Sequence, residues 1–136
     1  LGGIRESVQM WIHGEQIDVT IKDESIEYVD KDGNVQEETG YEGNPKTGER
    51  PLTGEEIAEE KLNEVDVDKT DDGKMILYFR DKKFDVTDNI ANKEYTFHVV
   101  TDGSEVYVKL DFDENGDFSI TTSPSAEWFT NYVELK

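Results

Sequence analysis

The sequence has no cysteine, only three prolines and only two histidines. Without cysteine the chain can form no structural disulfide, thiolate zinc site or cysteine nucleophile, although this absence assigns no compartment. Long hydrophobic runs are also missing: MILYF, at 75–79, is among the longest. No segment approaches the roughly 20 apolar residues that a membrane helix needs, so we expect no membrane insertion. No signal peptide is recognisable, and a start at Leu1 fits a processed chain or an expressed fragment.

Basic residues are scarce. The chain has 14 Lys and Arg against 33 Asp and Glu, a net charge of −19. Most of the acid excess lies in residues 23–68, with 16 acids and 4 bases. Because phosphate groups are bound by cationic side chains, this charge predicts no direct binding of nucleic acid or of an anionic membrane. It fits high solubility, cation binding or mimicry of nucleic acid.

Length and composition predict one modest domain. The chain has 136 residues, of which 34% are hydrophobic, so we expect a single domain over 1–136 with a single core. Residues 38–54 contain four glycines and two prolines without any periodicity. This stretch predicts a long mobile loop or insertion within the domain.

Turn residues between alternating apolar segments predict five β-hairpins. In the first, a Gly14-Glu15 turn would pair Ile12 with Ile17 and place the apolar residues of both strands on one face. The other four loops are predicted in the same way, at 31–33, 71–73, 102–103 and 114–116. A strand near 84–86 is expected between the third and fourth hairpins, followed by a loop with Asn89 and Asn92.

Two helices are predicted beside the strands. Thr53 and Glu56 have the spacing of a capping box, followed by a thin apolar stripe, so a short inserted helix is expected near 53–65. Ser123-Pro124 could open a second short helix near 124–131, and the segment NYVELK could instead form a last strand. The fold class is therefore β-rich, all-β to α+β: an antiparallel meander of hairpins forming a barrel-like or sandwich domain.

The last hairpin also resembles half of a calcium loop. Asp111, Asp113, Asn115 and Asp117 have the spacing of the first calcium ligands. The twelfth position, where a bidentate Glu is required, is Thr122, and the flanking residues are strand-like. We therefore predict a three-residue turn and no metal site, and leave open weak calcium contact.

No catalytic constellation is recognisable. His13 and His98 have no spacing for a metal pair, and no serine lies in a nucleophile motif. We expect no catalytic residue, cofactor or metal. The large aromatic residues Trp11, Trp128 and Phe129 are the strongest candidates for ligand contact, and closure of the core explains them equally.

By elimination, the sequence predicts a non-catalytic binding or interaction module of an exported or cell-surface bacterial protein. Its partner would be a protein or carbohydrate, contacted through loop 38–54 and the surfaces of Trp11 or Trp128. The alternative is an acidic inhibitor or immunity protein that occupies the basic groove of a nuclease-type partner. In that case a cytoplasmic location is expected.

Overall fold

The computed structural model describes residues 6–136, apart from the side chain of Trp128. Contacts group the chain into two compact units, Leu1–Glu64 and Val65–Lys136. The prediction of a single core is wrong, because the buried hydrophobic side chains form two clusters, one in each unit. The single domain over 1–136 stays a prediction.

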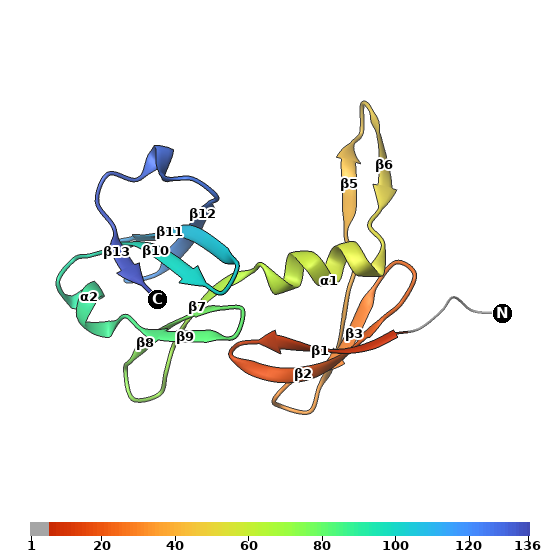
Figure 1. Cartoon of the computed structure of the whole chain (residues 1–136), viewed down its shortest axis with the longest axis horizontal. Helices are drawn as coiled ribbons and strands as arrows, with labels where there is room; N and C mark the ends of the chain where they lie inside the picture. The colour runs from red at the N-terminus through yellow and green to blue at the C-terminus, as the bar shows by residue number, and fades with distance from the viewer. Residues whose placement is uncertain (1–5) are drawn as a thin grey trace. The chain divides into compact units, whose positions relative to one another are not determined.

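The predicted β-rich class is confirmed. The strands are paired antiparallel, except for one parallel pair at the C-terminus, and the described residues form no closed barrel. In the first unit the sheet has the order β1-β2-β3-β4 (Figure 1). Its strands are β1 (Glu6–Ile12), β2 (Glu15–Ile21), β3 (Ile26–Val29) and β4 (Val35–Glu38).

Helix α1 (Gly54–Leu62) packs against β1, β2 and β3. The prediction of this helix is confirmed, including its capping box: the Thr53 hydroxyl accepts from the Glu56 N–H, and the Glu56 carboxylate accepts from the Thr53 N–H. The helix ends before the predicted stripe does, since Val65 already belongs to the next strand. The first core consists of Met10, Ile12, Val19, Ile21, Ile26, Tyr28, Leu52, Ile57 and Ala58.

The first hairpin turns one residue earlier than predicted. Met10 pairs with Ile17 and Ile12 with Glu15, so His13 and Gly14 are the central turn residues. Both have positive φ, 50° for His13 and 73° for Gly14, as a type I′ turn requires. When the turn moves by one residue, each residue of β1 pairs with a residue of β2 two positions away from the predicted one. Because side chains alternate with a period of two, the same side chains stay on the same face. The hydrophobic pattern therefore could not distinguish the two registers.

Within the predicted loop 38–54 the structure has a further hairpin, β5 (Tyr41–Asn44) and β6 (Gly48–Pro51). Its residues are almost all exposed, so no alternation of apolar and polar residues marks it in the sequence. Gly43 permits the close pairing, because a Cβ there would lie 2.1 Å from the carbonyl oxygen of Gly48. The loop prediction is thus corrected to a short hairpin, and its mobility stays a prediction.

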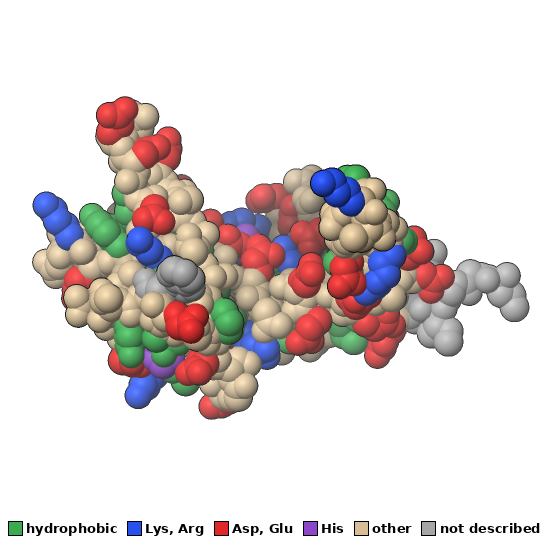
Figure 2. All heavy atoms as spheres, turned by 90° about the horizontal axis from the view of Figure 1, so that it is seen from above, with side chains coloured by type: hydrophobic (Ala, Val, Ile, Leu, Met, Phe, Trp, Pro, Cys, Tyr) green, Lys and Arg blue, Asp and Glu red, His purple; other side chains and the backbone are tan. Residues whose placement is uncertain are grey.

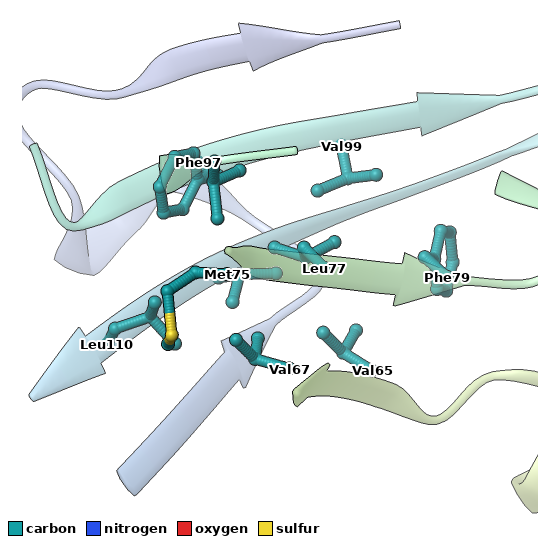
Figure 3. Packing of buried hydrophobic residues seen from close by; sticks show 10 residues of the cluster. Val65, Val67, Met75, Leu77, Phe79, Phe97, Val99 and Leu110 are labelled. Atoms are coloured by element: carbon teal, nitrogen blue, oxygen red, sulfur yellow. The ribbon is translucent and has the colours of Figure 1, made fainter. Parts of the chain in front are cut away.

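The second unit contains two sheets, of order β7-β8-β9 and β12-β11-β10-β13. The strands are β7 (Val65–Lys69), β8 (Met75–Phe79), β9 (Lys82–Asp85), β10 (Thr96–Thr101), β11 (Ser104–Phe112), β12 (Phe118–Ser123) and β13 (Val133–Leu135). Apolar side chains of β7 and β8 point toward those of β10 and β11, as in a sandwich (Figure 3). The central members Leu77, Phe97, Val99 and Val108 are fully buried.

The remaining hairpin registers are confirmed. The predicted pairs are Val29 with Val35, Val67 with Leu77, Val99 with Val106, and Leu110 with Ile120. Helix α2 (Thr87–Ala91) occupies the segment predicted as a loop. At the C-terminus both alternatives occur in part: a 3-10 turn, η1 (Ala126–Trp128), replaces the longer helix near 124–131, and β13 forms the last strand.

Candidate functional site

A groove of about 500 Å³ lies between the β5–β6 hairpin and helix α1, within the first unit. Its apolar part comes from Tyr41, at the start of β5, and Leu52, which follows β6. Tyr41 is 69% exposed, whereas Leu52 is buried. The groove is completed by the acidic residues Glu42, Glu55, Glu56, Glu59 and Glu60.

Arg50 holds the hairpin against the helix. Its guanidinium donates to both carboxylate oxygens of Glu56, at 2.8 and 2.9 Å, and also pairs with Glu42 of β5. Such a bidentate pair fixes the orientation of the two side chains better than a single hydrogen bond does. The hydrogen bond from Arg50 and that from the Thr53 N–H lower the pKa of Glu56 to about 2, so this carboxylate stays charged.

The base of the hairpin is closed by a backbone contact. The Leu52 N–H donates to the carbonyl of Gly40 at 2.8 Å. Two residues later, the Gly54 N–H donates to the carbonyl of Asp23, and a Cβ on Gly54 would lie 1.9 Å from the carbonyl oxygen of Lys22. Only glycine permits this approach, which places the first turn of α1 against the β2–β3 connection.

The helix side of the groove repeats negative charge at helical spacing. Glu55 and Glu59 are four residues apart, as are Glu56 and Glu60, so each pair shares one face of α1. Like charges at this spacing destabilise an isolated helix by about 0.2–0.5 kcal/mol per pair. Arg50 compensates Glu56, but no described basic side chain is paired with Glu55 or Glu60. A cation seated in the groove would relieve this repulsion.

Sequence reasoning found the segment but not the site. Loop 38–54 was predicted as a contact region, and Tyr41 and Leu52 of the groove come from it. The glutamates of α1 were not predicted as a contact site. Their four-residue spacing is a signal in the sequence, but its meaning depends on the hairpin that lies beside it.

The aromatic residues that were predicted as contacts differ in their surroundings. Trp11 is half-buried on β1, opposite Gln16 of β2 and on the other face from Met10 and Ile12. Phe129 is buried at 7% exposure and stacks on Tyr107, which lies on the sheet face opposite Val108 of the second core. The side chain of Trp128 lies outside the described part of the chain.

The calcium-like stretch is a turn. Phe112 pairs with Phe118, leaving the predicted three-residue loop at 114–116, with Gly116 at a φ of 82°. The carboxylate of Asp113 accepts from the N–H groups of Asn115 and Asp117, at 2.8 and 3.0 Å. The carboxylate of Asp111 lies 3.7 Å from the ammonium of Lys109. The carboxylates of Asp113 and Asp111 are thus engaged in turn hydrogen bonds and charge pairing, and weak calcium binding stays untested.

Comparison with known proteins found no matching family model, no matching curated protein and no matching solved structure. In the part of the chain that the structure describes, no helix is both long enough and apolar enough to cross a membrane. The groove and its surrounding residues are therefore the basis for the functional proposal.

Proposed function

We propose that this chain is a non-catalytic binding module that captures a basic, partly apolar segment of a partner protein in the groove between β5–β6 and α1. The observation that carries the proposal is the composition of the groove: exposed Tyr41 and buried Leu52 next to five glutamates. Lysine and arginine carry apolar stems and cationic heads, so they match such a lining. The ring of Tyr41 also offers a face to a cation.

The charge of the first unit supports a cationic partner. Residues 1–64 hold 17 acids and 6 bases, a net charge of −11. Acidic side chains are widespread on the face shown in Figure 2. A field of one sign speeds the encounter with an oppositely charged partner, while the apolar contacts decide which segment stays bound.

The exported or cell-surface setting is part of the proposal. It is an inference by elimination from the acidic, hairpin-rich sequence, in which no catalytic motif is recognisable. Its test is the full gene: a secretion signal or lipid-attachment signal upstream of Leu1 supports the setting, and a gene that starts at Leu1 without one contradicts it.

The binding proposal is tested by titrating the isotope-labelled chain with a peptide of alternating lysine and leucine, with a glutamate–leucine peptide as control. We expect backbone amide shifts to concentrate in residues 41–60. Replacing Glu55 and Glu60 by Gln should weaken binding, since it removes two carboxylates that have no described basic partner.

The matched control removes the same charge from the other unit, with Glu114→Gln and Glu127→Gln, and should leave binding nearly unchanged. Equal weakening by both double variants would show binding to net charge alone and would contradict a site in the groove. Amide shifts spread over all acidic segments would contradict it as well.

The alternative function is an acidic inhibitor or immunity protein. It is favoured by the carboxylates of β4 and α1, which could occupy a basic groove of a nuclease. The assay measures the inhibition of basic ribonucleases and deoxyribonucleases by the chain. Binding to such an enzyme should weaken steeply as the salt concentration rises. The absence of inhibition at low salt would reject this alternative.

A further inference from the structure

His98 lies between two glutamates on the sheet face opposite Phe97 and Val99. Its Nδ1 is 2.9 and 3.0 Å from the two carboxylate oxygens of Glu134, and its Nε2 is 2.9 Å from Oε2 of Glu105. A neutral imidazole carries a single N–H, so it can donate to only one of these partners. The imidazolium alone donates to both. The geometry therefore assigns the protonated ring to this arrangement.

Aromatic rings enclose the imidazole. The ring of Tyr107, directly opposite on β11, stacks on it at 4.3 Å with an interplanar angle of 11°. Tyr132 meets it edge-on at 5.6 Å. The His98 side chain is only 13% exposed, whereas Glu105 and Glu134 are about half exposed. The remaining charged residues of β11 on this face, Lys109 and Asp111, pair with each other.

The contact with Glu134 joins distant parts of the chain. Glu134 is the central residue of β13, a strand of three residues whose sheet partner is β10. The pairing is parallel and places His98 beside Glu134. Parallel pairs are slightly weaker per residue than antiparallel ones. The strand is held by three residue pairs with β10, by Val133 and Leu135 packed against the second core, and by the charged side-chain contact at its centre.

We propose that His98 is a protonation-controlled latch: with the imidazolium in place β13 is docked on β10, and loss of the proton favours release of the C-terminal strand. Release would leave β10 as an edge strand with unpaired backbone groups over Phe97–Val99. The proposal concerns the second unit and is independent of the groove.

The direction of the pH effect follows from the surroundings of the ring. Burial lowers the pKa of His98, but the hydrogen bonds and negative charges of Glu134 and Glu105 outweigh it, and the net pKa is raised. The contribution of the His98 imidazolium to the docking of β13 is therefore complete below the pKa of the free imidazole. This contribution is lost as the pH rises through the raised pKa of His98. Tyr107 stays neutral across this range, since its own pKa is also raised.

The test measures two quantities in the intact chain: the pKa of His98 by NMR, and hydrogen exchange of the amides at 133–135 from pH 5.5 to 8.5, corrected for intrinsic exchange. His98 has one acid dissociation constant when β13 is released and a smaller one when β13 is docked. Linkage requires the protection of these amides to fall, from low to high pH, by the ratio of these two constants. Glu134→Gln should lower the pKa of His98 and shrink the step in exchange. His98→Gln should abolish the step.

The other histidine provides the control. His13→Gln leaves His98 as the single histidine and should preserve the step at 133–135. Protection of β13 that is independent of pH in the unchanged chain would overturn the latch, and this measurement does not depend on any variant folding. An equal step in His98→Gln would overturn it as well, because another group would then be responsible.

Discussion

The turn at His13 gives the sharpest test of the structure against the sequence pattern. His13 has a φ of 50°, in the left-handed region, and Gly14 follows at 73°. In the register predicted from the sequence, His13 would instead be an extended strand residue before a Gly14-Glu15 turn. We propose comparing His13→Val with His13→Asn. Both remove the imidazole, so their difference reports on the backbone conformation at this position.

The expected magnitude follows from the left-handed conformation. It costs a non-glycine residue about 1–2 kcal/mol, with asparagine among the most tolerant and β-branched residues among the least. His13→Val should therefore be less stable than His13→Asn by about 1 kcal/mol or more. For a unit of this size, about 1 kcal/mol corresponds to roughly 4–8 °C in Tm. His13→Gly should be close to the Asn variant, since glycine adopts positive φ without steric strain.

The assay is urea and thermal unfolding followed by Trp11 fluorescence in a Trp128→Phe background, so that the signal comes from the first unit. The predicted register gives the opposite order, because valine is favoured over asparagine in an extended strand. Equal stability of the Val and Asn variants, or greater stability of the Val variant, would refute the left-handed turn at His13.

Three further outcomes are expected. Thr53→Ala should destabilise the first unit by about 1 kcal/mol through loss of the helix cap, with exposed Thr47→Ala as a near-neutral control, both measured by urea unfolding. Leu77→Ala should cost the second unit about 2–5 kcal/mol, because this side chain is fully buried, and a loss below about 1 kcal/mol would contradict the packing of the sandwich. Expressed alone, residues 65–136 should unfold cooperatively, since they hold a complete core; a chain that remains disordered would instead support the single domain 1–136.

Much of the local structure could be read from the sequence. The capping box at Thr53 and the three-residue loop at 114–116 each depend on residues within a few positions of one another. The β-rich class was predicted from the series of hairpins, whose strands have alternating apolar residues. Helix α2 (Thr87–Ala91) was missed because its five residues are too few to show a helical period, and none of them is buried.

The sequence by itself determined which face of each strand is apolar, because the side-chain period of a strand is two. It left the first turn ambiguous by one residue, since both positions preserve that face. Tertiary structure decided that the buried residues form two cores and that Arg50 holds an exposed hairpin beside the acidic helix. It also decided that Glu134 meets His98, 36 residues away in the chain. These features depend on contacts between distant segments, which no local period or turn motif encodes.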